Sequence, residues 1–123
     1  MTKIITLTTS SDSYLIDIGL DSPVYYEILS PIFDQLGVQA KSISLDDEKL
    51  VTFKNQLERA LENYIQHYQP GRGRGREKKI FGKNYFLTLL NPEHNAIALL
   101  NNVYIATVDC VQNDITLRFE YSE

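Results

Sequence analysis

The sequence predicts one α+β domain over residues 1–123, built as a mainly antiparallel sheet with two helical segments packed on one of its faces. Apolar and polar residues alternate near both ends of the chain, as in half-buried strands, whereas apolar residues in the middle recur every three or four positions, as in helices. A length of 123 residues and a hydrophobic content of 43% are typical of a single domain with its own core. The simplest packing of these elements places the helices over one face of a single sheet.

Residues 3–8 and 13–18 predict an N-terminal hairpin, because apolar residues alternate along the second run and residues 9–12 supply polar side chains that favour turns. The same alternation places Asp17 on the outer face beside Leu15. If helices covered that face, Asp17 would be a buried carboxylate and a candidate site.

The first helical segment is predicted to begin at Ser22 and Pro23, because serine caps helices and proline suits their first turn. Pro31 interrupts the segment, so either the helix kinks there or Ser30 and Pro31 open a second short helix. Gly37 is expected to end it.

A longer helix is predicted to begin within residues 44–47, which offer an amino-terminal cap, and to end before Pro70, with a short strand over residues 38–44 ahead of it. Acidic residues at its start suit the positive end of the helix dipole. Its apolar residues follow helical spacing: Leu50, Phe53, Leu57, Ala60, Leu61, Tyr64, Ile65 and Tyr68.

Residues 71–79 form a glycine–arginine segment that is expected to be a flexible basic loop, because glycines stand at three alternate positions and no apolar residue favours its ordering. From about Ile80, a C-terminal meander of about four strands is predicted, with strands over 96–100 and 103–109 and a turn at Asn101 and Asn102. Further turns are predicted over 91–95, which include His94, and over 112–114, which include Asp114. In the last strand, one side holds Ile115, Leu117, Phe119 and Tyr121, and the other holds Thr116, Arg118, Glu120 and Ser122. An alternative makes residues 92–101 a short helix, because Asn91 and Pro92 also form a good helix start. Cys110 is interpreted as an inert thiol in a buried or half-buried strand.

The charge is unevenly distributed, because half of the twelve lysines and arginines lie between residues 71 and 83, although the net charge of the chain is −4. Two interpretations remain open. The basic segment binds a polyanion or an acidic partner, or it folds back onto the acidic remainder of the chain. These six cations are the candidate binding residues: Arg72, Arg74, Arg76, Lys78, Lys79 and Lys83.

No catalytic, metal or cofactor signature is found. His67 and His94 have no partner at the spacing of metal ligands, and the paired carboxylates Asp46 and Asp47 are explained by their place at a helix start. The N-terminus does not resemble a signal peptide, and no apolar run approaches the roughly 20 residues that span a bilayer. Cytoplasmic residence without membrane attachment is therefore expected.

These observations favour a small non-enzymatic protein that binds another protein, of the inhibitor, immunity or regulatory kind. That function predicts an exposed apolar or acidic patch away from the basic segment. One alternative is nucleic-acid binding through residues 72–83, and another is a small enzyme or ligand binder with a site between helices and sheet. A homodimer joined through a sheet edge is a further expectation about partners.

Overall fold

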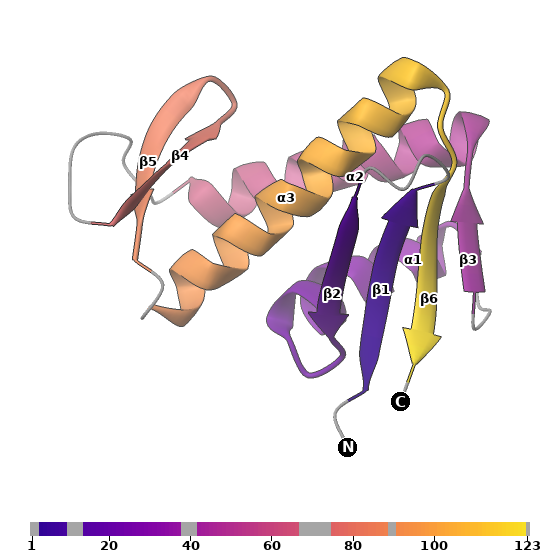
Figure 1. Ribbon diagram of the computed structural model, residues 1–123, viewed down its shortest axis with the longest axis horizontal. Coiled ribbons are helices and arrows are strands. Elements are labelled where there is room, and N and C mark those ends of the chain that lie inside the picture. Colours follow the sequence, from indigo (N-terminus) through magenta and orange to yellow (C-terminus); the bar gives the residue numbers. More distant parts are fainter. Residues whose placement is uncertain (1–2, 10–13, 38–41, 67–74, 89–90, 123) are drawn as a thin grey trace.

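The computed structural model describes residues 3–9, 14–37, 42–66, 75–88 and 91–122, and it confirms the α+β class. A four-stranded antiparallel sheet has the order β2-β1-β6-β3, and a separate antiparallel hairpin pairs β4 with β5 (Figure 1). The strand bounds are β1 Ile4–Thr9, β2 Leu15–Gly19, β3 Ser42–Leu45, β4 Arg76–Ile80, β5 Lys83–Leu87 and β6 Leu117–Ser122. The predicted N-terminal hairpin is thus present as β1 and β2, and β3 overlaps the end of the predicted short strand and runs one residue beyond it.

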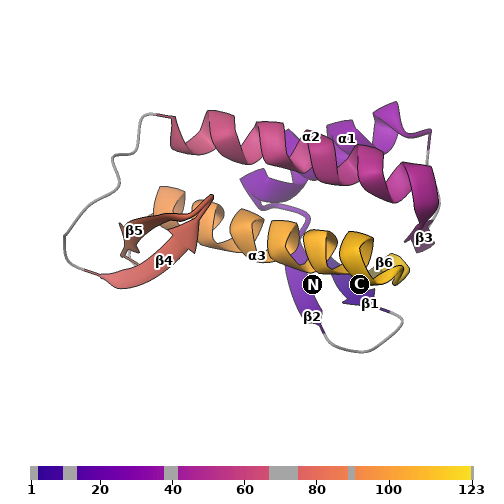
Figure 2. The same cartoon turned by 90° about the horizontal axis from the view of Figure 1, so that it is seen from above.

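Helices cover one face of the main sheet and leave the other open (Figure 2). Ile5 and Leu7 of β1 and Phe119 of β6 are fully buried on the covered face. Asp17 lies on the open face, where its Oδ1 accepts a hydrogen bond from the Thr6 hydroxyl at 2.7 Å, and Leu15 is 74% exposed. The hypothesis of a buried carboxylate at Asp17 is therefore wrong, because Asp17 is exposed and none of the helices that the structure describes packs over that face.

The core centres on three phenylalanines that join the sheet to two helices. The ring of Phe119 lies 5.0 Å from that of Phe33 in α1 (Ser30–Gln35) and 5.6 Å from that of Phe53 in α2 (Asp47–Ile65), measured between centroids. A π-helix, η1 (Val24–Leu29), leads directly into α1, which has Pro31 in its first turn. The second reading of Pro31, in which it opens a short helix, is confirmed, and Gly37 ends that helix with φ 71°.

The predicted C-terminal meander is wrong in its middle, because residues Pro92–Asn113 form one helix, α3, with 22 residues, whereas its last strand is present as β6. The alternative prediction of a helix over residues 92–101 was correct in the type of element, but the helix continues to Asn113. The Asn91 side chain caps the helix by accepting a hydrogen bond from the Glu93 backbone N–H at 2.9 Å. Apolar residues with helical spacing are buried along it: Ile97, Leu100, Val103, Ala106 and Cys110. The asparagines at 101 and 102, predicted as a turn, lie in the middle of this helix.

The basic segment is also more ordered than predicted. Residues 71–74 lie outside the described residues, as do His67, Tyr68 and Leu89, but Arg76–Ile80 form strand β4 instead of a loop. Phe81 and Gly82 connect β4 to β5 with φ values of 50° and 78°. Two consecutive positive φ values fit a type I′ turn, whose twist matches that of paired strands. Ile80, Tyr85 and Leu87 are buried, so one face of this hairpin joins the core.

Titration of two half-buried phenols predicts a loss of stability at high pH. Burial, followed by the hydrogen bond to Tyr25 at 2.9 Å between the hydroxyl oxygens, raises the pKa of Tyr121. Burial, followed by Glu58, raises the pKa of Tyr104. A raised pKa in the folded state means that the native protein holds these protons where the unfolded chain releases them. The stabilising contribution is complete below the ordinary tyrosine pKa of 10.0 and is lost as pH rises through the native values.

We therefore expect the free energy of unfolding, measured by urea denaturation, to fall as pH rises above about 10. In Tyr121→Phe that fall should be shallower, since one of the shifted phenols is gone. An unfolding free energy that stays constant up to about pH 11 in the native sequence would show that these phenols are not coupled to folding.

Candidate functional site

Two surfaces carry unusual chemistry, and they lie at opposite ends of the antiparallel pair α2 and α3 (Figure 2). At one end, the start of α2 and the end of α3 enclose a cavity. At the other end, the β4–β5 hairpin lies beside the first half of α3. The first surface is acidic and the second is basic.

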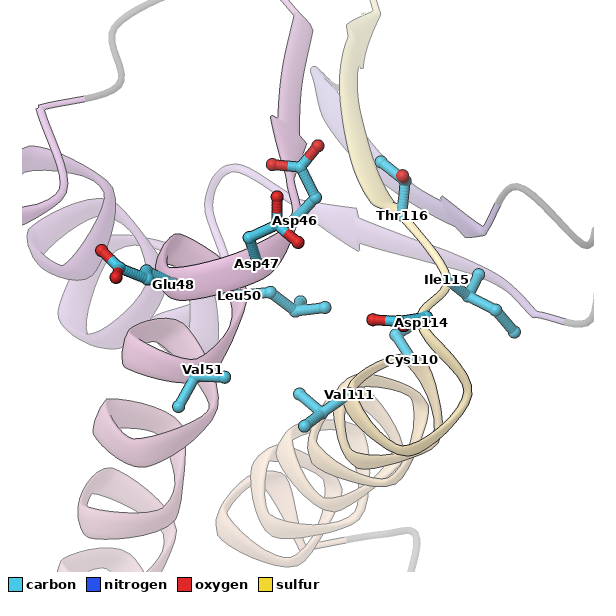
Figure 3. Close-up of a pocket in the computed structure, with 10 residues that line it drawn as sticks. All are labelled: Asp46, Asp47, Glu48, Leu50, Val51, Cys110, Val111, Asp114, Ile115 and Thr116. Carbon is cyan, nitrogen blue, oxygen red and sulfur yellow. The ribbon is translucent and has the colours of Figure 1, made fainter.

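The cavity has a volume of about 310 Å³ and is lined by the cap residue of α2, by residues of α2 and α3, and by the connection from α3 to β6 (Figure 3). Its lining residues are Asp46, Asp47, Glu48, Leu50, Val51, Cys110, Val111, Asp114, Ile115 and Thr116. Four of these are carboxylates and none is cationic. We name this site the acidic cavity.

The acidic cavity has an apolar floor and apolar walls beneath its carboxylates. Leu50 and Cys110 are buried, whereas Val51 is 43% exposed and faces Val111 across the opening (Figure 3). Asp114 points from the α3 side toward α2. An apolar slot with carboxylates above it suits a lysine or arginine side chain, whose methylene stem is apolar and whose end is cationic.

The four carboxylates of the acidic cavity make no hydrogen bond or ion pair through their side chains with any other residue that the structure describes. Asp46 occupies the cap position of α2 without a capping hydrogen bond, and Asp47 adopts φ 48°. At the start of α2 the helix dipole favours Asp46, Asp47 and Glu48. Their placement is thus explained locally, whereas their lack of partners leaves them available to an external cation.

Asp114 is not explained by local structure. It follows the last residue of α3 with φ 55° and ψ 44°, and the Ile115 N–H donates to the Cys110 carbonyl oxygen at 2.9 Å. This left-handed position normally holds glycine or asparagine. A carboxylate at the negative end of a helix dipole is also unfavourable. Residues that break local rules without a structural gain are candidates for function.

We expect Asp114→Asn to stabilise the protein by about 0.3–1 kcal/mol, because it removes a negative charge from the helix end and keeps a residue that tolerates positive φ. Urea denaturation at low ionic strength measures the change. Glu120→Gln, which removes a charge from the exposed sheet face, is the matched control and should shift stability by no more than about 0.5 kcal/mol. A destabilised Asp114→Asn would mean that the carboxylate has a structural role.

The residues around the acidic cavity give no support to nucleophilic or acid–base catalysis. Cys110 is 1% exposed, and burial, followed by Asp109, raises the pKa of its thiol. Its inertness was predicted, although it lies in a helix and not in a strand. The Nδ1 atom of His94 accepts a hydrogen bond from the Thr88 backbone N–H at 2.8 Å, in the first turn of α3 and not in a turn between strands. Within the described residues, no group of three or more His, Cys, Asp and Glu side chains could hold a metal ion.

The basic surface is the β4–β5 hairpin, which brings together four of the six predicted binding residues: Arg76, Lys78, Lys79 and Lys83. Arg72 and Arg74 lie outside the described residues. None of the four cations forms an ion pair within the described ranges. The interpretation that the basic segment folds back onto carboxylates of its own chain therefore finds no support among these four residues.

A shallower depression of about 370 Å³ lies between the η1–α1 segment and α2. Its lining mixes both signs of charge, with Glu27 and Arg59, and includes Gln35, Gln56 and Asn63. Because neither sign of charge predominates on this surface, it does not favour any particular class of ligand.

Sequence reasoning identified the basic residues but missed the acidic cavity. Asp46 and Asp47 were explained as helix-start residues, and Asp114 was placed in a turn between strands. The signal that could have found the site is the acidic residue directly after a helix, where glycine or asparagine is usual. That signal can be used only when residues 92–113 are already known to form a helix.

No protein-family model, curated protein or solved structure matches the chain. None of the helices in the described ranges has the length and apolar character needed to cross a membrane.

Proposed function

We propose that the chain is a non-enzymatic protein-binding domain that recognises a basic side chain of its partner in the acidic cavity. The observation that carries this proposal is that Asp46, Asp47 and Asp114, without partners among the described residues, lie around an apolar cavity of about 310 Å³, whereas Glu48 points away from it (Figure 3). An exposed patch of acidic and apolar residues away from the basic segment is what a protein-binding function requires. We place this activity in the cytoplasm.

The chemistry of the cavity favours a protein as the source of the cation. Val51 is 43% exposed at the cavity edge and supplies apolar contact area beyond the cavity itself. Protein interfaces combine such an apolar centre with a charged rim, and complementary charge increases the association rate and the specificity. A regulatory or inhibitory protein acts by covering a basic site on its target in this way.

Site-specific photo-crosslinking in the native host cell tests the proposal. A benzophenone amino acid replaces Val51 at the cavity edge in one variant and Ile105 in the other. The two side chains have matched exposures of 43% and 44%, but Ile105 lies on α3 away from the cavity lining. We expect a defined protein adduct from position 51 and none of the same mass from position 105.

The adduct from position 51 should disappear when Asp47→Asn and Asp114→Asn are combined, because the carboxylates that hold the cation are gone. The pair Asp34→Asn and Glu120→Gln removes the same charge from exposed positions elsewhere and should leave the adduct intact. Equal adducts from positions 51 and 105, or an adduct that survives loss of Asp47 and Asp114, would refute the proposed site.

A further inference from the structure

We infer that the β4–β5 hairpin is a second binding surface, separate from the acidic cavity, and that its ligand is a single-stranded nucleic acid. The hairpin differs in charge from the rest of the described chain. Residues 75–88 hold four cations and Glu77, whereas the other described residues hold thirteen carboxylates and five cations. The positive charge is therefore concentrated on one short ribbon.

The hairpin register places Arg76, Lys78 and Lys83 on one face of the ribbon and Lys79 on the other. Cross-strand partners share a face, and one face holds the pairs of Lys78 with Tyr85 and Ile80 with Lys83. Since Ile80 and Tyr85 are buried, Lys78 lies at the rim of that face, half-buried along its stem. The outer face holds Lys79 opposite Asn84 and Glu77 opposite Phe86. Phosphates following the ribbon would thus meet a cation on either side of it.

Aromatic side chains accompany the cations. Phe81 is 38% exposed in the turn, and its ring lies 5.5 Å from that of Tyr104 on α3, which fixes its orientation. Phe86 is half-buried on the outer face and is a diagonal neighbour of Lys79. Exposed aromatic faces beside cations bind unstacked bases, which only a single strand offers. This combination favours a single strand over a duplex and over an acidic protein.

Fluorescence anisotropy of a labelled single-stranded oligonucleotide, titrated at several salt concentrations, tests the inference on the full chain. The logarithm of the binding constant should fall with log salt by about 0.7 per phosphate contact, so four contacts predict about a 50-fold loss between about 50 and about 200 mM salt. With Lys79→Gln and Lys83→Gln combined, two contacts remain and the same loss should be about 7-fold.

Lys49→Gln combined with Arg118→Gln is the matched control, because it changes net charge equally at exposed positions outside the hairpin. It should keep the salt dependence of the native sequence. No binding at low salt, or equal effects of the two double variants, would overturn the inference. Displacement of the oligonucleotide by polyglutamate at equal charge concentration would overturn the assignment to nucleic acid in favour of an acidic protein.

Phe81→Asn separates stacking from folding. It creates an Asn-Gly pair at a turn with two positive φ values, which is the preferred pair for a type I′ turn, so the hairpin should be kept while the ring is lost. We expect affinity to fall by about 5- to 150-fold, as for loss of one base–aromatic stack, with an unchanged salt dependence. An unchanged affinity would show that bases do not stack on Phe81.

Discussion

Phe119→Ala is expected to destabilise the protein by about 3–5 kcal/mol, the usual cost of removing a buried phenylalanine. Phe119 is fully buried, and its ring makes edge contacts with the rings of Phe33 and Phe53. Those three rings join β6 to α1 and α2, so the cavity left behind cannot be filled by a local shift. Because domains of this size are stable by about 5–15 kcal/mol in total, much of the protein's stability should be lost.

Urea denaturation measures this loss, and Glu120→Ala is the matched control. Glu120 is the next residue of β6 and faces the open side of the sheet, so its replacement should cost no more than about 0.5 kcal/mol. If Phe119→Ala cost less than about 1 kcal/mol, the three rings would not form the centre of the core.

Gly75→Ala is expected to detach the β4–β5 hairpin while the main sheet stays folded. Gly75 has φ 118°, and a Cβ there would meet the carbonyl oxygen of Leu87 and lie 2.8 Å from its carbonyl carbon. The backbone conformation costs a non-glycine residue about 1–3 kcal/mol, and the overlap adds a similar amount. Among the described residues, the hairpin has no third strand to support it and is held only by its own pairing and by the packing of Ile80, Tyr85 and Leu87, so this cost should open it.

Amide hydrogen exchange distinguishes this local effect from global unfolding. Protection should be lost in β4 and β5 of Gly75→Ala and kept in β1 and β6. Gly82→Ala is the control within the same hairpin, because Gly82 also has positive φ, at 78°, but a Cβ there meets nothing within 4 Å. If both variants behaved alike, the contact between Gly75 and Leu87 would not set the hairpin geometry. Loss of oligonucleotide binding in a folded Gly75→Ala protein would agree with the second binding surface.

The sequence patterns were sufficient to predict those helices and strands whose apolar residues recur with one clear period. The alternation in β6, with Leu117 and Phe119 inward and Arg118 and Glu120 outward, was predicted and is confirmed. The spacing of Leu50, Phe53, Leu57 and Leu61 likewise predicted α2 correctly.

The prediction failed where apolar residues were too dense to show a period. Residues 96–111 are apolar at most positions, because α3 is buried on several sides. Such a run is compatible with either a strand or a helix. Because α3 was not predicted, the acidic cavity was missed as well. Asp114 can be recognised as part of the cavity only when it is known to follow a helix whose end lies next to the start of α2.

The prediction of a flexible loop in the basic segment failed for a different reason. Its local composition favours disorder, but Ile80, Tyr85 and Leu87 anchor β4 and β5 on the core through contacts that are distant in sequence. Composition over a short window does not contain those contacts. Four of the six candidate binding residues therefore lie on the β4–β5 hairpin, an arrangement that was not predicted, and their role in binding stays a prediction.

The most direct test of the central claim is an NMR titration of the ¹⁵N-labelled protein with a short peptide that contains one arginine. The matched control is the same peptide with citrulline, which keeps the shape of arginine and lacks its charge. We predict saturable amide shifts confined to the acidic cavity, around Val51, Val111 and Asp114, with the arginine peptide alone. They should be absent in the variant that combines Asp47→Asn with Asp114→Asn. Equal shifts with both peptides, or shifts spread over the other carboxylates of the surface, would contradict a cavity built to receive a basic side chain.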